Sequence, residues 1–288
     1  MNNGSHYRRS DLAVESLKEG TLPPRGVAVH QEHIGTLDIT TVRILDKSAA
    51  DSIGKPVGSY VTVSFPDFFE QGDSKAERSL SLSLAERLLA LLPTPSPRRV
   101  LVAGLGNRAI TADALGPFTQ EKLRINGHLE EEEAASFSPR LFAFAPGVMG
   151  KTGMETLSLI QGAVKSSSAD LLIVVDSLVA AETERLGRTV QLSDTGLIPG
   201  SGVGNHRAAL NRDSLGIPVI AIGVPLVVSS ATLVYDTLTR AGIDRFDGAV
   251  KDVLDGQESY FVTQKSCDLT CAVLSKVIAS AINRVFSQ

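Results

Sequence analysis

Alternation of apolar and polar residues in the first third of the chain predicts β-strands. Residues 26–30, 35–44 and 59–65 are rich in β-branched side chains and alternate in polarity, as half-buried strands do. Residues 78–92 instead place leucines at helical spacing and run into Pro93. This pattern predicts a helix that ends at the proline, so a β-rich N-terminal extension followed by a helix is expected.

The pattern changes after residue 98. Four short apolar segments are separated by stretches of helical character. They are RRVLVAGLG, RLFAFAP, DLLIVVDSL and IPVIAIGVP, at residues 98–106, 140–146, 170–178 and 217–225. Strands that alternate with helices are typical of a mainly parallel sheet with helices on both faces. We therefore expect an α/β fold, with the N-terminal strands as its extension.

The remaining segments complete the expected organisation. Residues 10–22 start with residues that favour helix caps and end before two prolines, which predicts a short helix or an ordered arm. Residues 240–258 have the composition of a polar excursion, and residues 267–286 predict a final helix. We expect residues 1–10 to form a short tail and residues 11–288 a single α/β domain.

Composition narrows the classes of partner. A net charge of -4 and a pI near 5.8 argue against direct binding to a nucleic acid backbone. No apolar run of about 18 residues and no secretory segment is present in the sequence, which indicates a cytoplasmic protein without a membrane partner. The five histidines lack zinc-site spacing, so no metal or other cofactor is expected, and Cys267 and Cys271 predict buried thiols.

The first candidate for chemistry is Asp113, in the stretch GLGNRAITADALGP. Gly104 and Gly106 permit a tight turn after a strand, and the aspartate follows nine residues after the first glycine. The G-x-G pattern lacks the acidic residue that a dinucleotide site requires. Asp113 could instead cap the helix that follows Ala112.

The second candidate is Asp176, which follows the apolar run LLIVV. A carboxylate there is costly unless it is hydrogen-bonded, metal-bound or catalytic, although capping of a following helix is the alternative. The carboxyl ends of parallel strands meet at one edge of a sheet, so Asp113 and Asp176 are expected to form a pair. In such a pair the charged member can activate water while the protonated member polarises a carbonyl.

A glycine-rich loop supplies further candidates. The segment SDTGLIPGSGVGNHR brings backbone N–H groups that could approach a ligand, although a plain flexible loop is the alternative. Its D-T-G string matches aspartic proteases only by coincidence, and Ser201 lacks the G-x-S-x-G order of a serine nucleophile. The candidates for substrate binding or oxyanion stabilisation are Gly104, Asn107, Gly200, Gly202, Gly204 and Asn205.

Several long strings occur in the order found in the spore germination protease family. They are SDLAVE, GSYVTV, GLGNRAITADALGP, APGVMGKTGMET, VVDSLVAAETERLGRTVQLSDTGLIPGSGVGNHR, SLGIPVIAIGVPLVV and VTQKSCDL. The chain resembles this family over residues 8–235 and again over 260–286. Such multi-motif strings are far more specific than a single glycine pattern.

The resemblance implies an endopeptidase with a phosphorylase-like α/β core, related in fold to the hydrogenase maturation endopeptidases. The two essential aspartates of the family fall on Asp113 and Asp176. The family substrates are small acid-soluble spore proteins, degraded in the spore core at germination. The resemblance further implies a homotetramer and a zymogen whose propeptide ends just before the segment that resembles SDLAVE, so residues 1–10 would be a residual propeptide.

Two other functions stay open at this point. The carboxylates could bind a metal, as in the hydrogenase maturation relatives, which would make the chain a metal-dependent endopeptidase. The chain could instead bind small spore proteins without cleaving them. Loss of cleavage on chelation would indicate the first, and retained binding without cleavage would indicate the second.

Overall fold

The computed structural model describes residues 10–17, 22–67, 72–129, 139–203, 207–243, 248–257 and 260–287. Within these residues, nine strands form one sheet in the order β1-β2-β3-β7-β8-β6-β4-β5, with β9 paired to β8. The strands are β1 (Val27–Ile34), β2 (Leu37–Ile44), β3 (Gly58–Ser64), β4 (Arg99–Gly104), β5 (Arg140–Phe144), β6 (Leu171–Ala180), β7 (Thr189–Ser193), β8 (Val219–Ser229) and β9 (Phe261–Val262). The α-helices are α1 (Lys47–Ile53), α2 (Ser74–Leu91), α3 (Leu115–Gln120), α5 (Met149–Thr152), α6 (Thr156–Ser167), α7 (Arg212–Leu215), α8 (Ser230–Arg240), α9 (Gly248–Gln257) and α10 (Cys267–Phe286).

The sheet has a parallel half and an antiparallel half. β8, β6, β4 and β5 run parallel to one another, whereas β1, β2, β3 and β7 are joined by antiparallel pairs. β7 also pairs antiparallel with β8 and so links the two halves. The expected α/β fold is confirmed, and the N-terminal strands continue the same sheet. The short strand β7 was not expected from the sequence.

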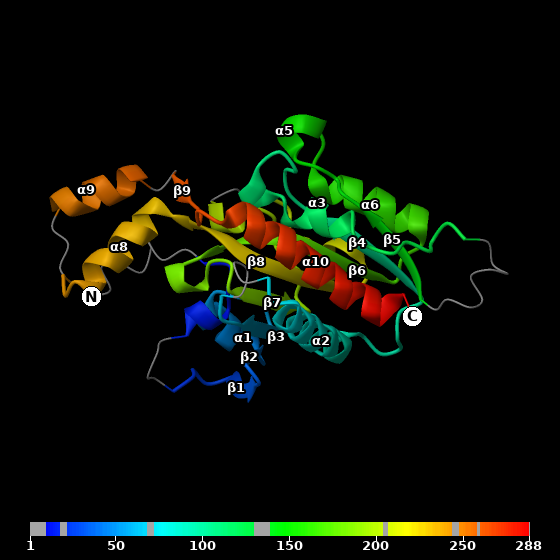
Figure 1. The fold of residues 1–288 in the computed structure, drawn as a ribbon, viewed down its shortest axis with the longest axis horizontal. Coiled ribbons are helices and arrows are strands. Elements are labelled where there is room, and N and C mark those ends of the chain that lie inside the picture. The colour runs from blue at the N-terminus through cyan, green and yellow to red at the C-terminus, as the bar shows by residue number, and fades with distance from the viewer. Residues whose placement is uncertain are drawn as a thin grey trace.

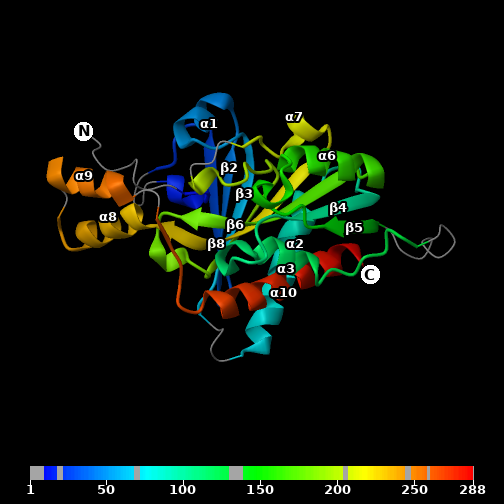
Figure 2. The ribbon, with the colours of Figure 1, turned by 90° about the horizontal axis from the view of Figure 1, so that it is seen from above.

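Helices cover both faces of the parallel half, because successive side chains of a buried strand point to opposite faces. On one face, Val100, Ile173 and their neighbours pack against α2, α3 and α10. On the other, Leu101, Leu172 and their neighbours pack against α6. Figure 2 shows α2, α3 and α10 on one side of the sheet and α6 on the other.

The N-terminal segment forms an ordered arm, one of the two forms expected for it, and not a short α-helix. Its only helical part is the 3-10 turn Val14–Ser16. Leu12 and Ala13 are fully buried, and the Asp11 N–H donates to the Val179 carbonyl across 2.9 Å. The arm, defined here as residues 10–17, therefore extends the sheet contacts at the end of β6. The expected tail lies almost wholly in residues 1–9, outside the described residues.

The C-terminal region holds two further findings. Residues 240–258, expected as a polar excursion, contain the helix α9, which packs on α8 through Leu254 and Ala231. Figure 1 shows this pair projecting from the end of the sheet. The final helix α10 matches the expected residues 267–286. It is long and apolar enough to cross a membrane by length and composition alone, but 56% of the tested window is buried in the protein, as in a core helix.

Candidate active site

Asp176 lies inside β6 and not at its end. β4 ends at Gly104, which is opposite Val175, so Asp176 occupies the first position of β6 beyond the neighbouring strand. By the alternation of the strand, its side chain shares a face with Leu172 and Val174, which α6 covers. The expectation that the strand ends here was wrong, since β6 continues to Ala180. The side chain accepts a hydrogen bond from the Ser177 amide across 2.9 Å and caps no helix.

A cavity of about 740 Å³ lies at this edge of the sheet. Asp113 and Asp176 both line it, together with Ala221 and Gly223 of β8. Asp176 is only 7% exposed, and its backbone pairs with Gly223. The predicted pair of carboxylates therefore meets in one cavity outside the parallel strands.

The turn after β4 holds Asp113 by its carboxylate. The Asn107 amide donates to Asp113 Oδ2 across 2.8 Å. Gly106 has φ +110°, and a Cβ there would meet the Asp113 carbonyl oxygen at 2.0 Å. α3 has no side-chain cap, so the alternative that Asp113 caps this helix does not describe the structure. The glycine is required because the turn folds back directly on the aspartate.

The two carboxylates have different electrostatic surroundings. Burial raises the pKa of Asp176 well above its usual value, and the negative charges of Asp113 and Asp11 raise it further. Burial also raises the pKa of Asp113, but the Asn107 amide and Arg207 oppose this effect. Asp176 is therefore the member of the pair that keeps a proton more readily, and Asp113 is the member that ionises first.

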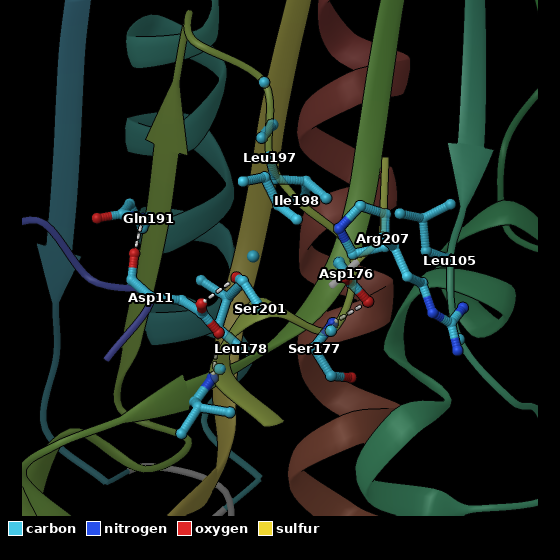
Figure 3. A pocket seen from close by; sticks show the side chains of 18 of the residues that line it. Asp11, Leu105, Asp176, Ser177, Leu178, Gln191, Leu197, Ile198, Ser201 and Arg207 are labelled. Carbon is cyan, nitrogen blue, oxygen red and sulfur yellow. Dashed lines mark hydrogen bonds between the residues drawn. The ribbon is translucent and has the colours of Figure 1, made fainter. Parts of the chain in front are cut away.

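The sequence reasoning missed several polar residues of the cavity, among them Arg207, Ser177 and Asp11. Arg207 lines the cavity, and its charge lowers the pKa of both catalytic candidates. Ser177 lines it as well, with a buried hydroxyl that has no hydrogen-bond partner among the described residues. Asp11 reaches the cavity from the arm. Figure 3 shows these side chains around Asp176. A lone arginine or serine carries no pattern that could have identified it.

The other predicted site residues fall into three groups. Gly200 and Gly202 line the cavity. Gly104 packs against Gly116 of α3, where a Cβ would meet the Gly116 carbonyl oxygen at 2.2 Å, and the Asn107 side chain accepts from the Ala109 amide. Gly104 and Asn107 thus shape the turn that carries Asp113. Gly204 and Asn205 lie outside the described residues, and the roles of all six in binding stay predictions.

A metal-dependent peptidase would need several ligand side chains gathered at one point. Among the described residues, no group of three or more His, Cys, Asp or Glu side chains is placed to hold a metal ion. Cys267 and Cys271 are buried free thiols in α10, as predicted.

The family model for germination protease matches residues 10–246. A germination protease of Caldanaerobacter subterraneus is 41% identical over 236 residues, covering 80% of this chain and 72% of that protein. One from Clostridium tetani is 35% identical over 306 residues, covering 96% of this chain and 94% of that protein.

Among solved structures, a [NiFe] hydrogenase maturation protease from Thermococcus kodakarensis is similar, with 16% sequence identity and a TM-score of 0.37. The match covers 66% of this chain and 95% of that chain. A likeness this slight adds nothing to the assignment, which rests on the sequence matches. By those matches, this chain belongs to the germination protease family.

Proposed function

We propose that this chain is an endopeptidase in which Asp113 and Asp176 act as a pair on a water molecule. The supporting observation is that both carboxylates line one cavity while their surroundings differ. Burial and two neighbouring negative charges raise the pKa of Asp176. Burial also raises the pKa of Asp113, but the Asn107 amide and the charge of Arg207 lower it. A charged base and a protonated acid are thus available side by side.

The chemistry follows from these two states. The Asp113 carboxylate takes a proton from water as the water oxygen attacks the peptide carbonyl carbon, and Asp176 gives its proton to the carbonyl oxygen. This produces a neutral diol and reverses the ionisation of the pair. The proton on Asp113 then passes to the leaving nitrogen as the C–N bond breaks, and a diol hydroxyl returns a proton to Asp176. The cycle consumes one water and restores both groups.

The substrate and setting extend this proposal. The strings shared with spore germination proteases support small acid-soluble spore proteins as substrates, cleaved in the spore-core cytoplasm at germination by a homotetramer. The Ser177 hydroxyl and the loop with Gly200 and Gly202 line the same cavity. They are candidates for contacts with the substrate backbone and the developing oxyanion.

The test is cleavage of a small acid-soluble spore protein, followed by mass spectrometry with and without chelator. We expect discrete cuts that survive chelation and that fall by roughly 10²- to 10⁴-fold in Asp113→Asn and in Asp176→Asn. Asp170→Asn is the matched control, because Asp170 accepts the Arg98 and Arg99 amides at the other end of the strands. It should cleave at the parent rate.

The pH dependence gives a second readout. Activity should fall as the pH drops through the pKa of Asp113, because the base becomes protonated, and fall again as the pH rises through the raised pKa of Asp176. Parent activity in either Asn variant would remove that residue from the mechanism. Cuts lost on chelation would indicate a metal-dependent peptidase, and binding without cuts would indicate a binding protein.

A further inference from the structure

The arm docks on β6 just beyond Asp176. The Asp11 amide donates a hydrogen bond to the Val179 carbonyl. In addition, Asp11 Oδ2 accepts a hydrogen bond from the Val179 N–H across 2.9 Å. The Glu15 carboxylate, whose side chain is 0% exposed, accepts the amides of Ala181 and Glu182 across 2.8 and 2.9 Å. Leu12 is fully buried in a cluster with residues of β6 and β8. These contacts hold the arm in a fixed position on β6, where it forms part of the cavity lining.

The Asp11 carboxylate also holds the loop on the opposite side of the arm. Its Oδ1 accepts from the Ser201 hydroxyl across 2.8 Å. The next residue, Gly202, packs directly against Asp11 and Val179. A Cβ on Gly202 would lie 2.6 Å from Asp11 Oδ2 and 2.5 Å from Val179 Cγ2. One carboxylate therefore ties β6 to the loop 197–203, which lines the cavity. Figure 3 shows Asp11 bonded to Ser201, and Gln191 bonded to the Asp11 backbone.

Asp11 also belongs to the charge set of the site. The charged groups that act on Asp176 come from three elements: Asp113 from the turn before α3, Asp11 from the arm and Arg207 from the loop after the 3-10 turn Ser201–Val203. Lys55, which donates to the Ser10 carbonyl across 2.8 Å, faces the arm rather than this pair. Both Asp11 and Lys55 line the cavity.

We propose that Asp11 is a positioning residue of the active site, which fastens the loop 197–203 to β6 and sets the charge that Asp176 experiences. The proposal rests on the proposed function, and it gives the arm a part in building the site. The tether should affect how the substrate is held, since the loop lines the cavity. The charge should affect the pH at which Asp176 loses its proton.

Two substitutions separate these effects. Asp11→Asn keeps the shape and can still accept from Val179 and bond to Ser201, but it removes the charge. Asp11→Ala removes both the tether and the charge. We expect Asp11→Ala to raise KM by roughly ten- to a hundredfold, the effect of losing hydrogen bonds to a charged group. Both variants should move the high-pH limb of the activity profile to lower pH, because the negative charge of Asp11 raises the pKa of Asp176.

Further variants act as controls. Ser201→Ala breaks the tether without changing charge, so it should raise KM and leave the high-pH limb in place. Asp194→Asn is matched to Asp11→Asn, because Asp194 lies just before the loop 197–203, accepts the Ser59 amide across 2.7 Å and does not line the cavity. It should change neither quantity. Circular dichroism of each variant establishes that it folds.

The outcomes are separable. Parent KM in Asp11→Ala and Ser201→Ala, together with an unshifted high-pH limb in Asp11→Asn, would overturn the proposal. Equal shifts in Asp194→Asn would also overturn it, since the effect would then be general to the loop. If Asp11→Ala does not fold, Asp11→Asn and Ser201→Ala still decide. Activity in Asp176→Asn would instead refute the proposed two-aspartate function, whatever Asp11 does.

Discussion

Gly106→Ala tests whether the turn after β4 positions Asp113 for catalysis. Gly106 has φ +110°, and a Cβ on its backbone would lie 2.0 Å from the Asp113 carbonyl oxygen and 2.8 Å from Asp113 Oδ1. Real Cβ atoms essentially never approach another heavy atom within 3.0 Å, so that carbonyl must retreat by at least 1.0 Å, which is 3.0 minus 2.0. The new methyl group thus displaces the residue that carries the base.

Two costs follow. The backbone strain of a non-glycine residue at this φ is about 1–3 kcal/mol, and forcing an extra carbon into a packed site costs about 1–3 kcal/mol. We therefore expect a loss of roughly 2–6 kcal/mol in the free energy of unfolding. A catalytic group displaced by about 1 Å loses on the order of 10²-fold in rate, so kcat should fall by about that factor.

The assay compares this variant with Gly35→Ala, using urea unfolding and cleavage kinetics at saturating substrate. Gly35 lies in the β1–β2 hairpin with φ +64°, and a Cβ there would meet nothing within 4 Å. It reports the backbone strain alone, about 1–2 kcal/mol, and should keep the parent kcat. A folded Gly106→Ala enzyme with kcat within about threefold of the parent would refute the reasoning, because a shift of this size is expected to cost far more.

Two other predictions concern buried ionisable groups. Asp176→Asn should be more stable than the parent at neutral pH. Burial raises the folded-state pKa of Asp176, so the parent protein loses stability as the pH rises from the unfolded-state pKa to the folded-state pKa. The Asn variant has no group to ionise at this position and avoids this loss. Urea unfolding across pH checks this, and equal stability of the two proteins at neutral pH would contradict it. Burial raises the pKa of Cys271 to about 12, so a thiol reagent should label this residue only on unfolding, and rapid labelling of the native protein would count against the packing of α10.

The fold could be predicted from the sequence wherever periodicity decides the structure. The apolar runs of β4, β5, β6 and β8 and the repeat of α10 were identified. β7 was missed although its sequence TVQLS alternates polar and apolar residues, and the structure buries its three polar side chains as well as its two apolar ones. Residues 10–22 were expected to form either a short helix or an ordered arm, and long-range hydrogen bonds stabilise the arm. The Val179 amide of β6 donates to Asp11, and the Ala181 amide just after β6 donates to Glu15. Local propensity cannot predict such partners.

The candidate site shows the same division. Asp113 and Asp176 could be identified because a carboxylate beside a tight turn, or inside an apolar run, is physically unusual. Asp11 and Arg207 could not be identified, because each lies in a polar stretch where its type is ordinary. Their proposed roles come from their charges, which act on Asp176 in the folded protein. The sequence thus predicts residues whose burial is energetically unfavourable better than it predicts the residues that surround them in the site.

The arm has a consequence for the order in which the protein is made. Asp11 leaves the ribosome before its partner Ser201, which follows 190 residues later. At synthesis rates of about 5–20 residues per second, roughly 10 to 40 seconds separate the two. The hydrogen bond between Asp11 and Ser201 cannot form during that interval. A nascent chain that already contains Asp113 and Asp176 therefore still lacks the loop that completes the lining of the cavity. A complete cavity would therefore arise late in synthesis, only after Ser201 has emerged.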